Sequence, residues 1–567
     1  MRLSTSFSHR LMISIGFMSF VVQSHGQNQS EKYELNYLNV REGIGPFQQK
    51  GDLKNRPDIY VITVDMLSPD VYLPSRVLQK YIHTPHLDQL AESGTVFNKA
   101  FSTSPLCGPS RATILTGRHQ SYLTNGDRAP LGMKRNLGEQ DIIFPEYLKK
   151  SGYELKHIGK WHVGAEKFVQ TFGESQHGWD RWAPPLEDDE LYVAYLNDKK
   201  VKPQKYSKEI FGMQYDRQTK GNSLGGWIVQ QDNQPFPLEA HYSVFLAELA
   251  KQRLDNFKHK NADQPVFLQL EFFDPHQPYS IPAGFEERYE TLKKVVKLPA
   301  SYQRVLDSNF SQLQGEDNIY ELYRQYWGLY DQEMLKDYII GHLLQMEVVD
   351  KAVGMFFDYL KEKGLWEKSV VIFYADHGDM NGRMGMADKG VYFQPDIFRL
   401  PIYIKEPSNS NKVKVVDSPV STLDIGPTIL DYAGIKTPEY MEGESLVSVI
   451  KGNQRSKLHH VFQTGWHVGV NYGFGYQFQV DETHWFYGYN LSTGTQELYN
   501  IDADTQINHF YDSDKEELRK YIITEVAKIM QADNRWLGYW AGFRLHNASY
   551  LPIATDDMQM FKPKKLN

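Results

Sequence analysis

The residue with the most distinctive chemistry in this chain is its only cysteine, Cys107, in the segment Cys107-Gly108-Pro109-Ser110-Arg111. Pro109 is typical of the first turn of a helix, and the apolar run after it stops at Gly117. The pattern therefore predicts a helix with Cys107 at its amino end. Unpaired N–H groups and the positive end of the helix dipole favour an anion there. The position suits a reactive thiolate, although a lone cysteine without such neighbours is more often buried and inert.

A thiol protease or a thiol phosphatase would need further residues around its nucleophile. The segment has no phosphate-cradling loop, and no Cys-His-Asn arrangement can be assigned. With one cysteine the chain can form no internal disulfide, so its fold must rest on its hydrophobic core.

Here the chain resembles the type I sulfatases. Cys107-x-Pro109-Ser110-Arg111, followed by Thr116-Gly117-Arg118, is similar to the first signature of that family. In the family a modifying enzyme, a formylglycine-generating or an anaerobic sulfatase-maturating enzyme, converts the cysteine to formylglycine (3-oxoalanine). The hydrated aldehyde of formylglycine is then the nucleophile.

A second signature supports the resemblance, which with the later motifs covers nearly all of residues 56–510. Gly152-Tyr153 and then Gly159-Lys160-Trp161-His162-x-Gly164 look like the family's second motif. Lys160 and His162 are two residues apart, and both are expected just beyond a short strand at 153–158. Taken alone, a Lys and a His on a loop are usually solvated; the full motif implies that both line one pocket.

Asp65, Asp376 and His377 are candidate metal ligands, because carboxylate oxygens at strand ends suit a hard cation such as calcium. Capping of a following helix or turn is the commoner role for such an Asp. The resemblance implies one divalent cation, calcium, bound by these residues with residue 107. Many sulfatases have a second acid directly after the first, and this chain has Met66 there, so water or another residue would complete the site.

His276 in Pro275-His276-x-Pro278 and Lys389 in Lys389-Gly390 resemble family residues that hold sulfate and protonate the leaving oxygen. With them, the implied catalytic residues are Cys107, Arg111, Lys160 and His162, and the implied substrate-binding residues are Lys160, His276 and Lys389. Family members often carry a His in the segment that matches residues 383–385, and this chain has none.

The elements that position these residues follow from apolar runs at 58–64, 266–273 and 369–374, each ending before an Asp-containing turn. Largely apolar strands indicate a sheet covered on both faces. Helices are expected between them, one from Pro85 to before Gly94 and one over 338–360. The alternation predicts an α/β fold with a mostly parallel central sheet, alkaline-phosphatase-like by the resemblance. Ligands collect at the carboxyl ends of such strands, which puts Asp65, residues 274–276 and residues 376–377 together.

After about residue 455 the pattern changes to short aromatic alternations at 476–480 and 485–489, then 497–499 and a helix near 515–530. This predicts a smaller C-terminal α+β subdomain with an antiparallel sheet. The expected organisation is a signal peptide at 1–26, a catalytic domain at 27–455, the subdomain at 456–545 and a tail at 546–567. The pattern of residues 187–234 does not define their path.

The net charge and the first residues of the chain indicate which partners are unsuitable and where the protein is located. A net charge of −8 without a long run of one sign argues against a nucleic acid partner. Arg2 and Arg10, an apolar stretch at 11–22 and Ser24-x-Gly26 are typical of a signal peptide, so an exported, periplasmic or secreted protein is expected. An uncleaved anchor is the alternative; no later segment is long and apolar enough for a membrane span.

The function implied is a sulfatase acting on a sulfated polysaccharide or oligosaccharide. Aromatic residues, 13% of the chain, can stack on sugars but are first of all core material. Trp466, His467 and Tyr472 are candidates to border the pocket. The alternatives are a phosphodiesterase or phosphonate monoester hydrolase of the same superfamily, and a non-catalytic glycan-binding protein in which Cys107 stays a thiol.

Overall fold

The computed structural model describes residues 56–119, 136–138, 141–260, 263–407, 414–453, 455, 460–464, 473–532 and 536–551. All of them fall within one compact unit, Phe47–Asn567. The expected signal peptide and the expected pocket residues Trp466, His467 and Tyr472 lie outside the described residues. Among the described helices, none combines the length and the apolar character that a membrane crossing requires.

The core is a large sheet whose middle strands are parallel. Its strand order is β11 (Lys414–Val416), β2 (Thr95–Phe101), β10 (Arg399–Lys405), β9 (Val370–Ala375), β1 (Ile59–Val64), β7 (Val266–Glu271), β3 (Glu154–Lys160) and β4 (His177–Trp179). From β9 to β4 neighbouring strands are parallel, while β10 runs antiparallel to β9 and β2. Every residue of β1, β7 and β9 is buried, as expected for strands covered on both faces. The predicted α/β class is confirmed.

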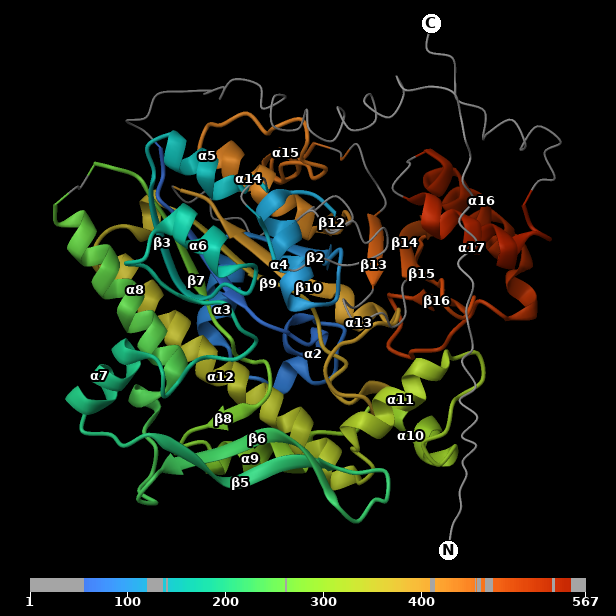
Figure 1. The fold of residues 1–567 in the computed structure, drawn as a ribbon, viewed down its shortest axis with the longest axis horizontal. Helices are drawn as coiled ribbons and strands as arrows, with labels where there is room; N and C mark the ends of the chain where they lie inside the picture. The colour runs from blue at the N-terminus through green and yellow to red at the C-terminus, as the bar shows by residue number, and fades with distance from the viewer. Residues whose placement is uncertain are drawn as a thin grey trace, which may run out of the picture. The chain divides into compact units, whose positions relative to one another are not determined.

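Helices cover both faces of this sheet (Figure 1). On one side α3 (Pro85–Glu92), α8 (Tyr242–Lys258) and α12 (Gln332–Glu362) pack together, and on the other α4 (Cys107–Thr116), α5 (Phe144–Lys150) and α14 (Ile425–Tyr432) do so. The helix predicted from 338 begins earlier, at Gln332. The reason is a cap: the Asp331 side chain accepts hydrogen bonds from the N–H groups of Glu333 and Met334.

The remaining helices of the described chain are shorter or lie at the periphery. They are α2 (Pro69–Tyr72), α6 (Ala165–Phe172), α7 (Glu190–Asp198), α9 (Glu286–Val295), α10 (Ala300–Asp307), α11 (Asn318–Trp327), α13 (Pro395–Phe398) and α15 (Val447–Ile450). Residues 187–234 contain α7 and a long hairpin of β5 (Gln204–Met213) and β6 (Lys220–Gln230), which β8 (Tyr279–Ile281) extends into a separate small sheet. A short strand, β12 (Val420–Ser421), pairs with β2.

The C-terminal part contains the predicted antiparallel sheet. Its strands are β13 (His460–Thr464), β14 (Gly473–Val480), β15 (Thr483–Asn490) and β16 (Gln496–Asn500), with α16 (Glu516–Ala532) and α17 (Leu537–Asn547) beside them (Figure 1). The sequence reasoning missed α17. Its signal was an aromatic series at helical spacing: Trp536, Tyr539, Trp540 and Phe543 pack into the same core as Phe474 of β14.

A buried carboxyl links α11 to this C-terminal sheet. The hydroxyls of Tyr320 and Tyr499 each donate to Glu497 Oε2 at 2.5 Å. Burial raises the pKa of Glu497 from 4.5 to about 8, although both tyrosine hydrogen bonds oppose the rise. Between these two pKa values the native chain holds a proton that the unfolded chain has lost, so this group makes folding less favourable as the pH rises from about 5 to about 8.

We predict that Glu497→Gln makes stability less dependent on pH. The Tm of the variant minus that of the wild type should increase by about 3 °C between pH 5 and pH 8. Thermal unfolding followed by circular dichroism at both pH values measures this difference. Glu517→Gln, at an exposed position of α16, is the matched control. An equal difference at the two pH values would contradict the assignment.

Candidate active site

Neighbouring parallel strands bring their last residues to one edge of the sheet. Asp65 follows β1, Asp376 follows β9, and Glu271 and Lys160 are the last residues of β7 and β3. Lys160 was expected in the loop beyond the strand. It lies in the strand itself because β3 continues its pairing with β4 as far as the partners Lys160 and Trp179. These side chains surround the amino end of α4, which begins at Cys107.

Cys107 lies at the centre of this group and is 7% exposed. Its Sγ is 3.5 Å from Asp65 Oδ1 and 3.2 Å from His377 Nε2, and the His162 ring hydrogen-bonds to the thiol. Burial alone would raise the pKa of the thiol, but the charges of Lys389, Lys160 and His377 bring that pKa well below its usual value. The site therefore stabilises negative charge at the end of residue 107.

Asp65, Cys107, Asp376 and His377 form a cluster whose possible ligand atoms all lie within 4.8 Å of one another. His377 Nδ1 donates to the Gly378 carbonyl at 3.0 Å, so Nε2 is the ring nitrogen that faces the cluster and would bind a metal ion in place of a proton. Burial opposes a charge on this imidazole, but Asp376 and Cys107 raise its pKa to about 9. The negative field favours a positive charge here, and these donors fit a divalent cation.

Arg111 is held by hydrogen bonds behind the cluster. Its Nε donates to Asp376 Oδ2 at 2.8 Å, and one terminal nitrogen donates to Glu271 Oε2 at 3.0 Å and to the Lys160 carbonyl at 3.1 Å. The other terminal nitrogen is buried without a hydrogen bond to any described residue, and Asp65 Oδ2 is 3.9 Å from it. This nitrogen offers a donor that a bound anion can use.

Asp65 and Lys160 form a buried ion pair. The ammonium also donates to the Trp182 carbonyl at 2.7 Å and lies 5.2 Å from the centre of the Phe273 ring. Burial and Cys107 would raise the pKa of Asp65, but Lys160, His276 and Arg111 lower it below its usual value. Asp65 is accordingly held as a carboxylate.

His276 and Lys389 form a hydrogen-bonded pair in the site. His276 lies between two cis peptide bonds, Asp274–Pro275 and Gln277–Pro278. Its Nδ1 donates to the Gln277 carbonyl, which leaves Nε2 to accept a hydrogen bond from Lys389 Nζ. Burial would lower the pKa of Lys389, but Asp388, at 3.0 Å, and the charges of Cys107 and Asp65 raise it. The ammonium is therefore a charged donor beside an imidazole.

The structure shows what contacts are made at the two positions where the sequence departs from the family pattern. Met66 provides no oxygen ligand; its N–H donates to Asp376 Oδ1 at 3.1 Å and its sulfur lies 3.7 Å from Lys389 Nζ. Arg383, in the segment without a histidine, forms ion pairs with Asp70, Asp396 and Asp504. These ion pairs hold the segment in place, and none of the three carboxylates paired with Arg383 belongs to the cluster of candidate metal ligands.

The structure thus brings together every candidate site residue: Asp65, Cys107, Arg111, Lys160, His162, His276, Asp376, His377 and Lys389. Sequence reasoning missed Glu271 and Trp182. Glu271 had a usable signal, since a charged residue at the end of a largely apolar strand is rarely buried without a partner. Trp182 had none, because its contact with Lys160 uses a backbone carbonyl.

Comparison with known proteins assigns the family. A sequence model described as sulfatase matches residues 59–435. The chain belongs to the sulfatase family. In the C-terminal part of this sulfatase, residues 382–532 match the family described as N-sulphoglucosamine sulphohydrolase, C-terminal. The chain is accordingly a sulfuric ester hydrolase, as the signatures around Cys107 and Lys160 predicted.

This sulfatase is similar to several named sulfatases and to solved structures. It is 25% identical over 510 residues to an arylsulfatase of Clostridium perfringens, covering 86% of this chain and 97% of the relative. It is 22% identical over 472 residues to an N-acetylglucosamine-6-O-sulfatase of Bacteroides thetaiotaomicron, covering 75% and 77%. Among solved structures, a phosphonate monoester hydrolase from Silicibacter pomeroyi has a TM-score of 0.65 at 18% identity, covering 84% of this chain and 96% of that one. This last likeness shows the fold alone.

We predict that Glu271→Gln slows this sulfatase by loosening Arg111. The change keeps the size of the side chain but removes the carboxyl oxygen that accepts from Arg111, and hydrogen bonds to a charged group contribute about 1.5–3 kcal/mol, so kcat should fall about tenfold or more. Steady-state kinetics on 4-nitrophenyl sulfate, normalised to folded protein, measures the effect. Glu166→Gln, on an exposed position of α6, is the control. A lower Tm with an unchanged kcat would show that Glu271 serves only the fold.

Proposed function

We propose that this sulfatase hydrolyses sulfate esters of a carbohydrate through a formylglycine made from Cys107. The observation that carries the proposal is the surrounding of residue 107: Asp65 and His377 within 3.5 Å of the thiol, and the cations Lys160 and Lys389 close enough to lower its pKa. The hydrated aldehyde would supply two hydroxyl groups, one to attack sulfur and one whose deprotonation releases sulfate. A formylglycine-generating or anaerobic sulfatase-maturating enzyme would install it.

Asp65, Asp376, His377 and residue 107 would together hold one calcium ion. Bound there, the ion would supply positive charge against the oxygens of the sulfate group. The two carboxylates suit a hard cation, whereas the imidazole of His377 and the absence of an acid at Met66 make the set poorer in oxygen ligands than a typical calcium site. Calcium therefore rests on the family resemblance.

Arg111 and Lys160 would bind the sulfate oxygens and offset the charge that develops on them. Lys160 is held by Asp65, and Arg111 by Asp376 and Glu271, so both cations are fixed before substrate arrives. The buried nitrogen of Arg111 that makes no hydrogen bond within the described chain has its donor available for this contact.

Proton transfer would be divided between two sets of residues. The pair Lys389 and His276 would deliver a proton to the leaving alcohol oxygen as the S–O bond breaks. On the other side, His162 would accept the proton from the remaining hydroxyl, so that sulfate departs and the aldehyde is restored. Burial lowers the pKa of His162, although its hydrogen bond to Cys107 opposes this, so the imidazole is neutral and able to accept. Overall, ester and water give alcohol and sulfate.

The carbohydrate substrate is supported by the relative named as an N-acetylglucosamine-6-O-sulfatase. Degradation of a sulfated polysaccharide by an exported enzyme agrees with the signal-like segment at 1–26. We also propose the organisation deduced from the sequence, a catalytic domain at 27–455 followed by a subdomain at 456–545.

A direct comparison of substrates tests the function. The matured enzyme should hydrolyse 4-nitrophenyl sulfate with a kcat/KM at least about 100-fold above that for bis(4-nitrophenyl) phosphate, a difference of about 2.7 kcal/mol. Faster turnover of the phosphate diester would assign the chain to the phosphoesterase and phosphonate hydrolase alternative. Mass spectrometry of the peptide containing residue 107 addresses the other alternative, since a thiol retained in a host with the maturating enzyme would favour a glycan-binding protein.

A further inference from the structure

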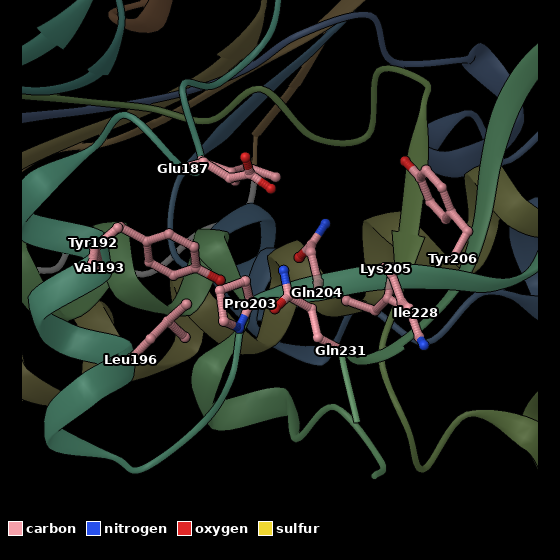
Figure 2. Close-up of a pocket in the computed structure, with 11 residues that line it drawn as sticks. Glu187, Tyr192, Val193, Leu196, Pro203, Gln204, Lys205, Tyr206, Ile228 and Gln231 are labelled. Atoms are coloured by element: carbon pink, nitrogen blue, oxygen red, sulfur yellow. The ribbon is translucent and has the colours of Figure 1, made fainter. Parts of the chain in front are cut away.

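A large cavity lies between α7 and the β5–β6 hairpin, in the segment whose path the sequence did not define. Its volume is about 620 Å³, which is within the range of roughly 300–1,000 Å³ typical of ligand sites. Figure 2 shows the lining side chains: Tyr192, Val193 and Leu196 come from α7, Gln204 and Lys205 from β5 and Ile228 from β6. The cavity is thus walled by a helix on one side and a hairpin on the other.

A smaller cavity adjoins this space and is lined in part by residues next to His276. It measures about 90 Å³ and shares Leu186, Gln204 and Tyr206 with the large cavity. Its other end is lined by Phe273 and Asp274, which directly precede the turn that carries His276. The Phe273 ring is stacked on the His276 ring, with centroids 5.0 Å apart. The walls of the small cavity therefore include a residue that contacts His276 and three residues that also line the large cavity.

Trp182 lies beside the Phe273 and His276 rings and directly precedes Ala183, a residue that lines the small cavity. Its side chain is 55% exposed, and its ring centroid is 6.1 Å from that of Phe273 and 6.2 Å from that of His276. Its backbone is fixed, because the carbonyl accepts the hydrogen bond from Lys160. An exposed indole beside the site is a surface on which the apolar face of a sugar ring can stack.

The polar groups of the large cavity are available to a ligand. The side chains of Glu187, Gln204, Lys205 and Gln231 form no hydrogen bond or ion pair with any residue that the structure describes. Amide, ammonium and carboxylate groups bind sugar hydroxyls in both directions, as donors and as acceptors. The tyrosine and aliphatic side chains between them provide the apolar surface that a sugar ring also needs.

We propose that Trp182 and the α7/β5–β6 cavity bind the saccharide chain that carries the sulfate ester. Trp182 contacts the sulfated sugar, and the cavity holds the sugars attached to it. This inference rests on the proposed function, and it deepens that function: the enzyme recognises an oligosaccharide and binds it more tightly than the corresponding monosaccharide.

Calorimetric binding to the Cys107→Ala variant of the full chain tests the proposal without turnover. The probes are tetrasaccharides and monosaccharides prepared from heparin, chondroitin sulfate, carrageenan and ulvan. We expect at least one tetrasaccharide to bind with a Kd about tenfold or more below that of its monosaccharide, a gain of about 1.4 kcal/mol. Adding Lys205→Ala and Gln231→Ala, or separately Val193→Trp to fill the cavity, should abolish that gain. Lys200→Ala, an exposed lysine on the same segment that does not line the cavity, should preserve it.

The proposal is overturned if no tetrasaccharide of the four sources binds more tightly than its monosaccharide, or if the gain persists in both cavity variants. Either result leaves the proposed function intact when the matured wild type hydrolyses sulfate esters. Failure of the matured wild type to hydrolyse any sulfate ester would instead refute the proposed function, whatever the binding data show.

Discussion

Replacement of Cys107 by alanine should abolish sulfate ester hydrolysis and leave the fold intact. Under the proposed mechanism the variant lacks the thiol that the maturating enzyme oxidises, so no aldehyde can form, and loss of a nucleophile typically costs about 10⁴-fold or more in kcat. The side chain is small and lies at the first turn of α4, where helix bonds do not depend on it. The surrounding cations stabilise negative charge at residue 107, so the Tm of the variant should be equal to that of the wild type or modestly lower.

Turnover of 4-nitrophenyl sulfate and the thermal midpoint, measured on the same preparation, check this prediction. The preparation should come from a host with the maturating enzyme, and the wild type from a host without it serves as a second comparison. That unmatured wild type should be as inactive as the variant. Activity within about tenfold of the matured wild type would show that residue 107 is not the nucleophile.

Removal of the metal ion should also eliminate activity, and calcium should restore it. Asp65 and Asp376 are fully buried beside each other, and burial together with Asp65 raises the pKa of Asp376. A cation offsets this repulsion as well as the charge on the substrate, so its loss should lower kcat by about 10³-fold and also lower the Tm.

Metal analysis of dialysed protein, followed by titration with Ca²⁺, Mg²⁺ or Zn²⁺ while activity and Tm are measured, tests this. Asp376→Asn should bind the ion more weakly and start from a lower Tm, since it also loses the ion pair with Arg111. Asp514→Asn, at a position whose side chain is 71% exposed, is the control. Full activity in protein shown to be free of metal would contradict the proposed centre, and restoration by Zn²⁺ alone would replace calcium as the ion.

Local sequence patterns predicted the elements that carry the site. The apolar runs before Asp65 and Asp376 became buried parallel strands because β-branched and aromatic residues with no polar alternation fit only a sheet covered on both faces. Pro109 and Gly117 marked the helix that begins at Cys107, since proline tolerates the first turn and glycine the left-handed cap at φ 66°.

Other contacts could not be predicted because nothing local encodes them. Residues 187–234 have no clear period, and although β5 and β6 pair with each other locally, the third strand of their sheet, β8, comes from far along the chain. The contact of Lys160 with Trp182 depends on a backbone carbonyl, to which any residue type contributes equally. Glu271 contacts Arg111 across 160 positions, a separation at which sequence pattern carries no distance information.

The sequence by itself determined the chemistry of this sulfatase: a cysteine at a helix amino end, acids at strand ends, and the signatures that identify the family. Those are properties of residue type and short spacing. The tertiary structure decided what surrounds them: Arg111 leaves one donor without a partner among the described residues, Met66 lies beside Lys389, and the cavity beside α7 adjoins a smaller one lined by Phe273. The physical reason is that packing between distant segments, and not local propensity, fixes which side chains share a charge, a hydrogen bond or a cavity wall.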